Sequence, residues 1–202
     1  RRQRQMCIRD RYQLEPIEFE YLDVIVPTYY VLTTAEASSN LSRFDGVRYG
    51  FRDSQHANTL QEMYTQTRSK GFGKEVQRRI LLGNFVLSAG YFDAYFTKAQ
   101  QVRQLLVNRT RDIFSQYQAI LLPTVPSTAF RLGEKNTDPV EMFLGDIYTV
   151  FANLVGIPGI SLPLFRHPNG LPFGLQLMTS HFDELTLLRF SKQMIELAET
   201  PE

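Results

Sequence analysis

The sequence has one cysteine, no long apolar run and almost no net charge, and each of these features excludes a class of protein. It holds a single cysteine, Cys7, which excludes an internal disulfide framework and favours a reducing, cytoplasmic setting. No run of about 18 apolar residues occurs, so we expect neither a membrane span nor a membrane partner. The basic start is followed by no apolar stretch of the kind that signal peptides carry.

Charge, histidines and glycines exclude further classes. The formal net charge is +1, so we expect no nucleic-acid footprint, which would need a clustered basic surface. The three histidines, His56, His167 and His181, are spread over turn-like positions with no pair four residues apart, and we expect no metal site. Gly71-Phe-Gly73 lacks the third glycine and the lysine–hydroxyl pair of phosphate-binding loops, so we expect this chain to bind no ATP.

Short apolar runs alternate with longer periodic segments, and this alternation predicts an α/β fold. Strands are expected over 23–27, 119–123, 159–163 and 172–178, the last two paired as a hairpin around a turn at 167–170. Helices are expected to begin at Tyr29, with Thr28 as the cap, and over 60–68, 74–88, 91–117, 140–144, 147–154 and 183–197.

The helix expected over 74–88 carries two adjacent arginines, Arg78 and Arg79. Successive residues lie about 100° apart around a helix, so one arginine can face solvent while the other lies closer to the core. The buried face is expected to consist of Ile80, Leu81, Phe85 and Leu87. An inward arginine pairs with an anion, which is either a carboxylate of the protein or that of a ligand. The arginine pair alone does not decide between the two.

Several further blocks occur in a fixed order, and together with 71–95 they carry a family resemblance. The chain resembles the A subunits of bacterial glutamyl-tRNA(Gln)/aspartyl-tRNA(Asn) amidotransferases, which are amidase-signature glutaminases, from about residue 12 to about residue 197. The blocks are Val26-Pro-Thr-Tyr-Tyr30, Glu36-Ala-Ser-Ser-Asn40, Phe44-Asp-Gly-Val-Arg-Tyr-Gly50, Asn153-Leu-Val-Gly-Ile-Pro-Gly159 and Gly170-Leu-Pro-Phe-Gly-Leu-Gln176.

The resemblance implies part of an amidase-signature fold, a mixed sheet flanked by helices on both faces. The family carries its chemistry on a lysine and two serines in a Gly-Ser-rich stretch, and this sequence holds no such run. We therefore expect residues 12–202 to be the C-terminal portion of an amidase-signature domain, with no catalytic residue and no activity of its own. Residues 1–11 are strongly basic and unlike the family; we expect a foreign or disordered terminus, the alternative being a nucleic-acid-binding arm.

The resemblance also implies three substrate-binding residues. Arg79 matches the arginine that holds the α-carboxylate of glutamine, Asp146 the acid that meets its α-amino group, and Tyr29 a tyrosine that contacts the same substrate. A free amino acid has one anionic and one cationic end, so one base and one acid suit it. The alternative for Asp146 is an ordinary acid at a helix N-terminus. The Ser38–Ser39 pair and Ser161 are interpreted as structural, because no base adjoins them.

The function that the resemblance implies is the glutamine-recognition part of a glutaminase subunit. The whole subunit would release ammonia from glutamine, and B and C subunits would complete a complex that converts Glu-tRNA(Gln) to Gln-tRNA(Gln) for protein biosynthesis. ATP and Mg would be used by the B subunit, which also holds the aminoacyl-tRNA. Two alternatives remain open at this point: part of an amidase for small amides with no tRNA partner, and a non-catalytic assembly surface.

Overall fold

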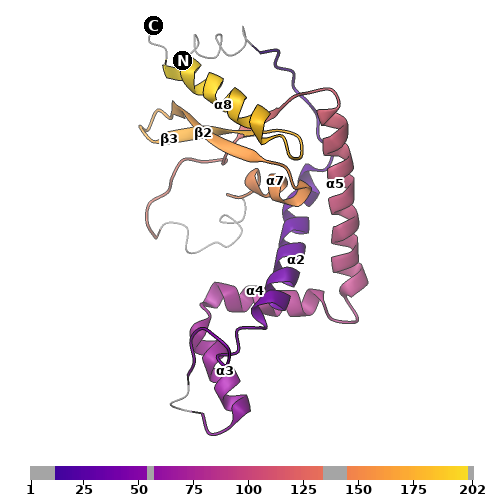
Figure 1. The fold of residues 1–202 in the computed structure, drawn as a ribbon, viewed down its shortest axis with the longest axis vertical. Helices are drawn as coiled ribbons and strands as arrows, with labels where there is room; N and C mark the ends of the chain where they lie inside the picture. The colour runs from indigo at the N-terminus through magenta and orange to yellow at the C-terminus, as the bar shows by residue number, and fades with distance from the viewer. Residues whose placement is uncertain (1–11, 54–56, 134–144, 200–202) are drawn as a thin grey trace. The chain divides into compact units, whose positions relative to one another are not determined.

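The computed structural model describes residues 12–53, 57–133 and 145–199 (Figure 1). The chain folds as two compact units, which are taken one at a time below. The sheet unit consists of the residues up to Val26 and from Arg103 onward, and the helical unit consists of Pro27–Val102. The helices are α2 (Leu22–Leu41), α3 (Leu60–Gly71), α4 (Lys74–Val86), the π-helical turn η1 (Asp93–Thr97), α5 (Lys98–Phe114), α7 (Thr149–Val155) and α8 (Glu184–Glu199). The strands are β1 (Ile120–Pro123), β2 (Gly159–Arg166) and β3 (Pro172–Met178).

The sheet unit is built on three antiparallel strands in the order β1-β3-β2. The predicted hairpin is confirmed: β2 and β3 pair directly, and Gly170 closes the turn between them with a φ of 86°, a conformation that favours glycine. Strand β2 runs beyond its expected end at Pro163, because a shift of register between Leu162 and Phe165 accommodates the proline, which cannot donate to the ladder.

Helices cover both faces of this sheet. Leu162, Leu164 and Leu177 form the core with Leu187 and Met194 of α8. Consecutive residues of β3 point to opposite faces, yet all three from 176 to 178 are buried, so the second face is covered as well. In Figure 1, α7 lies on the side of the hairpin opposite α8. The α/β class is thereby confirmed, although the three described strands include no parallel pair of the kind that a mixed sheet contains.

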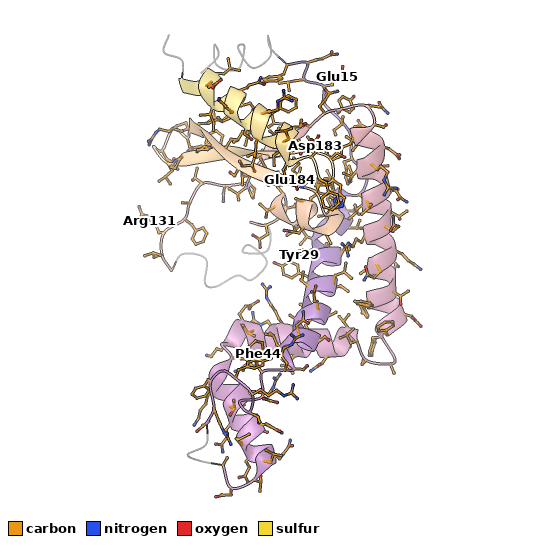
Figure 2. The ribbon with its side chains drawn as sticks, in the orientation of Figure 1. Glu15, Tyr29, Phe44, Arg131, Asp183 and Glu184 are labelled. Carbon is orange, nitrogen blue, oxygen red and sulfur yellow. The ribbon has the colours of Figure 1, made fainter. Side chains whose placement is uncertain are left out.

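Helix α8 begins as its sequence predicts. The backbone N–H of Thr186 donates to the carboxylate of Asp183 (3.4 Å), which caps the first turn (Asp183 and Glu184 are labelled in Figure 2). Further along the helix, the buried hydroxyl of Ser191 donates to the carbonyl of Leu187 (2.7 Å), so no hydrogen-bonding group is lost on its inner face. Each leucine that such a face buries contributes about 1.5–3 kcal/mol.

Helix α2 corrects one prediction. Instead of a strand over 23–27 followed by a helix, a single helix runs from Leu22 to Leu41 and includes Pro27. The apolar run at 24–26 is too short for its periodicity to separate a strand from a helix. Proline removes one helical hydrogen bond, but its side chain is exposed here, while Ile25 and Thr28 on either side of it are buried.

In the helical unit, α3 follows its prediction and α4 departs from it. Thr59 accepts a hydrogen bond from the backbone of Glu62 (3.2 Å) and caps α3. The residues of α4 that are buried are Gly83 and Val86, whereas Leu81 is 70% exposed and Phe85 is 41% exposed. The predicted buried face was therefore wrong for Leu81 and Phe85, because the helix turns its smallest residue inward, whereas Ile80 and Leu87 are half-buried.

Gly83 lies inward because α2 crosses α4 closely there. A Cβ atom on Gly83 would lie 2.0 Å from the carbonyl oxygen of Thr34 and 2.6 Å from the Cβ of Ser38. The hydroxyl of Ser38 donates to the side-chain oxygen of Asn84 (2.7 Å) at the same crossing. The small side chains of α2 at this crossing thus permit close packing.

The long helix expected over 91–117 is present with an interruption. Its first part is the π-helical turn η1, after which α5 ends at Phe114. Leu106 and Ile113 are buried, whereas Leu105 and Tyr95 are 48% and 42% exposed. Helix α7 begins two residues later than expected and ends at Gly156, whose φ is 73°. The helical turn expected at 140–144 lies outside the described residues. Across the described parts of the chain, no helix combines the length and the apolar character needed to cross a membrane.

Candidate substrate-binding site

Arg79 shares one carboxylate with its neighbour on α4. Its Nε lies 3.1 Å from Oε1 of Glu75, while Nη1 of Arg78 lies 3.0 Å from Oε2 of the same residue. The side chain of Arg79 is 38% exposed and that of Arg78 is 63% exposed, so Arg79 is the less exposed member of the pair. One carboxylate serves two guanidinium groups, which leaves the trio with an excess of one positive charge.

The guanidinium group of Arg79 keeps a free edge. It uses Nε for Glu75, and its two Nη atoms make no hydrogen bond to any residue that the structure describes. Those two atoms form an edge of the guanidinium group that can donate two parallel hydrogen bonds to one carboxylate. The protein-carboxylate alternative is thus realised at Nε, and the remaining edge can still receive the carboxylate of a ligand.

The ring beside Arg79 belongs to Tyr30. The guanidinium carbon of Arg79 lies 5.9 Å from the centre of the Tyr30 ring, within the range of a cation–π contact. Tyr29, labelled on α2 in Figure 2, packs edge-to-face on Tyr30 with 5.5 Å between ring centres. Tyr30 was not among the predicted site residues, and the only sequence signal for it was the adjacent pair of tyrosines.

The α2–α4 crossing positions this arrangement. Tyr30 and Thr34 are four residues apart on α2, and Arg79 and Gly83 are four residues apart on α4, so each pair lies along one helical face. Because Thr34 touches Gly83, Tyr30 is brought beside Arg79 one turn away. Close packing of the α2 and α4 backbones therefore sets the distance between Tyr30 and Arg79.

Asp146 lies in the sheet unit, in the turn that leads into α7, whose N-cap is Tyr148. Its backbone carbonyl accepts hydrogen bonds from the N–H groups of Thr149 and Val150 (both 3.1 Å). The side chain is exposed, and its carboxylate makes no hydrogen bond within the described part of the chain. Tyr29 and Arg79 belong to the helical unit, so the joint action of the three residues on one substrate stays a prediction.

The serines that could have been nucleophiles have structural surroundings. Ser38 is buried and donates to Asn84 across the helix crossing. The hydroxyl of Ser161 lies 2.8 Å from that of Thr124, and no histidine, lysine or carboxylate among the described residues hydrogen-bonds to either hydroxyl. A serine becomes a nucleophile only beside a base, so the geometry here offers none. Within the described ranges, no group of three His, Cys, Asp or Glu side chains could hold a metal ion.

Comparison with known proteins supplies the family. The family model described as amidase matches residues 2–188, and the chain belongs to this family. It is 55% identical over 185 residues to the A subunit of the glutamyl-tRNA(Gln) amidotransferase of Acidobacterium capsulatum, covering 92% of this chain and 39% of that protein. It is 54% identical to the corresponding protein of Brevibacillus brevis, covering 86% of this chain and 35% of that protein. The resemblance carried by the sequence blocks is therefore confirmed.

Solved structures agree on the fold. The crystal structure of the glutamyl-tRNA(Gln) amidotransferase A subunit from Thermotoga maritima matches 92% of this chain and 35% of its own, with 37% identity and a TM-score of 0.64. The 6-aminohexanoate cyclic dimer hydrolase matches 98% of this chain with a TM-score of 0.69 but only 17% identity, and so shares the fold alone. The chain spans about two fifths or less of the length of these relatives.

Proposed function

We propose that this chain is the glutamine-recognition part of the glutaminase subunit of a tRNA-dependent amidotransferase, a ligase that forms a carbon–nitrogen bond. The whole subunit releases ammonia from glutamine, and the complex uses it to convert Glu-tRNA(Gln) to Gln-tRNA(Gln). The observation that carries the proposal is the free Nη edge of Arg79 held beside Tyr30. The similarity to amidotransferase A subunits, which covers both residues, supports it.

In this proposal each residue of the site has one task. The Nη edge of Arg79 binds the α-carboxylate of glutamine, and the face of Tyr30 keeps the guanidinium group in place. Asp146 receives the α-ammonium group. Arg79 and Asp146, which together we call the clamp, orient the side-chain amide of glutamine for attack by a nucleophile outside this chain. The chain binds no cofactor, whereas ATP and Mg act in the B subunit, which together with a C subunit completes a cytoplasmic complex.

The alternative with a specific feature in its favour is an amidase for small amides, since remote solved structures of that kind share the fold. An uncharged amide needs neither an arginine edge nor an acid at its far end. An arginine edge that no described residue of the protein uses therefore favours an amino-acid substrate.

The decisive test places residues 12–202 in a full-length subunit with its partner subunits and compares glutamine with free ammonia as the nitrogen source. Arg79→Ala should lower kcat/KM for glutamine, mainly through KM. A hydrogen bond to a charged group contributes about 1.5–3 kcal/mol, which corresponds to roughly 10- to 150-fold. Arg79→Lys should rescue only in part, because an ammonium group lacks the planar fork. Ammonia-dependent amidation should be unchanged.

Arg78→Ala is the matched control, because Arg78 pairs with the same Glu75 yet points to solvent. Tyr30→Ala should raise KM for glutamine more than Tyr29→Ala does, since Tyr30 is the ring that touches Arg79. Asp146→Asn should impair glutamine and spare a substrate amide that lacks the α-amino group. Equal loss with glutamine and with ammonia, accompanied by a lower melting temperature, would mean that these residues only hold the fold.

A further inference from the structure

Exposed aromatic rings and arginines alternate along the loop that follows α2. Between residues 43 and 52, the rings of Phe44, Tyr49 and Phe51 are 40%, 46% and 56% exposed (Phe44 is labelled in Figure 2). Together with Phe72 they line a hollow of about 80 Å³ in the helical unit. The exposed arginines Arg43, Arg48 and Arg52 are interleaved with these rings. We call residues 43–52 the aromatic–basic loop.

The aromatic–basic loop is fastened to α3 at both ends. At its start, Nη1 of Arg68 donates to the carbonyls of Leu41 (2.8 Å) and Phe44 (3.1 Å). Just beyond its end, the backbone N–H of Asp53 donates to the hydroxyl of Thr67 (3.0 Å), and the buried carboxylate of Asp53 pairs with the ammonium group of Lys70. A loop tied in this way presents its rings in one arrangement, so a ligand meets a preformed surface.

Glycine makes this arrangement possible. Gly46 has a φ of 78°, and a Cβ atom there would lie 2.6 Å from a methyl group of Thr67. Gly50 also has a positive φ, of 85°. A side chain at the first position would push the loop away from α3, and at either position it would strain the backbone.

The exposed charge of the loop is positive. Asp53 is paired with Lys70, so its charge is neutralised. Asp45 stays charged while it accepts a hydrogen bond from the backbone N–H of Val47 (2.9 Å), and its charge interacts with that of Arg48, so it offsets one of the three arginine charges. Arg52 forms no ion pair with any residue in the described ranges, and Arg43 donates to the neutral amide oxygen of Asn40 (3.3 Å). The formal charge of +1 for the whole chain averages this local excess away.

We propose that the aromatic–basic loop binds single-stranded RNA. Flat rings that alternate with arginines match a polymer in which bases alternate with phosphates, and base stacking on exposed aromatic rings is how proteins hold unpaired strands without reading their sequence. Arg48 and Arg52 neutralise phosphates, while Tyr49 and Phe51 receive bases. A duplex does not fit, because its bases are already stacked on one another.

This goes beyond the proposed function, in which a partner holds the tRNA while α2 and α4 bind glutamine. If both hold, unpaired nucleotides of the aminoacyl-tRNA are the natural occupant. The loop carries none of the clamp residues, so binding of RNA can be measured without glutamine, ammonia or partner subunits. Failure of one proposal is thereby distinguishable from failure of the other.

The test measures fluorescence anisotropy of a labelled single-stranded RNA of about ten nucleotides, mixed with the 202-residue chain. Arg48→Ala/Arg52→Ala should weaken binding at least tenfold. It should also reduce the slope of log Kd against log salt by about 1.4, the value for two phosphate contacts on a single strand. Tyr49→Leu/Phe51→Leu keeps apolar bulk but removes both flat faces, and should weaken binding roughly tenfold or more.

Arg78→Ala/Arg111→Ala removes two exposed positive charges elsewhere and is the matched control, expected to change Kd less than twofold. Photocrosslinking of 4-thiouridine RNA to the chain, mapped by mass spectrometry, should mark residues 44–52. The proposal is overturned if the control pair weakens binding as much as the loop pair, if the ring variants bind normally, or if the crosslinks map elsewhere. Tighter binding of the matching duplex, or of an acidic peptide, overturns it equally.

Discussion

At the scale of single residues, Tyr117 carries a pH-dependent link in the sheet unit. Its hydroxyl donates to the carboxylate of Glu15 (2.9 Å; Glu15 is labelled in Figure 2). This hydrogen bond raises the pKa of Tyr117, with loss of solvation and the charge of Glu15 adding to the effect. The proton that makes the bond is therefore held more tightly in the folded chain than in the unfolded one.

The sign of the expected effect follows from that direction. A pKa raised by folding stabilises the protein fully below the ordinary tyrosine value of about 10, and this stabilisation is lost as pH rises through the folded value. Melting temperatures measured at alkaline pH should therefore fall more steeply for the native chain than for Tyr117→Phe. Because the chain has 10 tyrosines, the titration is isolated as a difference spectrum against that variant. Glu15→Gln should shift the difference titration to lower pH, and identical curves with and without Glu15 would contradict the link.

For the residues of the candidate site, the sequence predicted which way a side chain faces better than it predicted which residues that side chain contacts. The angle between successive helical residues predicts that one of the two arginines lies closer to the core, and the structure shows that this one is Arg79. The choice between Tyr29 and Tyr30 could not be made in this way, because it depends on where α2 crosses α4. Glu75 was missed for the opposite reason: an acid four residues before an arginine is so common on helices that it carries little information.

At the scale of elements, the α2–α4 crossing is the most demanding contact of the helical unit. Gly83→Ala should destabilise the chain, because the new methyl group would lie 2.0 Å from a backbone oxygen of α2, which cannot swing aside. Overpacking of this kind costs about 1–3 kcal/mol and outweighs the gain of up to about 1 kcal/mol that alanine brings to a helix. The free energy of unfolding, measured with denaturant, checks this.

Gly90→Ala is the control for that measurement, since nothing lies within 4 Å of the corresponding position, the φ of Gly90 is not in the left-handed region, and the residue lies outside the helices and strands. It should leave the free energy of unfolding nearly unchanged. A stabilised Gly83→Ala variant would show that α2 and α4 separate easily. The glutamine KM of a full-length subunit with Gly83→Ala should also rise, because Tyr30 would move with α2.

Most helices and strands were predictable, and the errors share a physical origin. Strands β1 and β3 and helices α3 and α8 have strong local signals: proline ends, a hairpin turn and helix caps. The errors arose where apolar residues were assumed to be buried, as for Leu81 on α4, or where a three-residue apolar run had to be assigned, as for 24–26 in α2. Burial depends on what packs against an element, and local periodicity does not contain that information.

At the scale of the whole molecule, we expect glutamine recognition and glutamine hydrolysis to depend on different parts of the protein. The purified 202-residue chain should release no ammonia from glutamine, because binding groups alone cannot replace the covalent step. The measurement is an ammonia assay at saturating glutamine, with Ser161→Ala as the control variant. Steady ammonia release that disappears in Ser161→Ala would show that the Thr124–Ser161 hydroxyl pair is catalytic after all.

Glu75 determines which side of the Arg79 guanidinium group is open to a ligand, in addition to forming ion pairs with Arg78 and Arg79. The carboxylate of Glu75 accepts the hydrogen bond from Nε of Arg79 and so blocks that side of the guanidinium group. The side that carries the two Nη atoms stays accessible. In the proposed function, the carboxylate of glutamine therefore reaches Arg79 at its Nη edge. In that function, the site then selects small anions by whether they fit at the Nη edge beside the Tyr30 ring. The positive charge of Arg79 alone would not predict which anions bind.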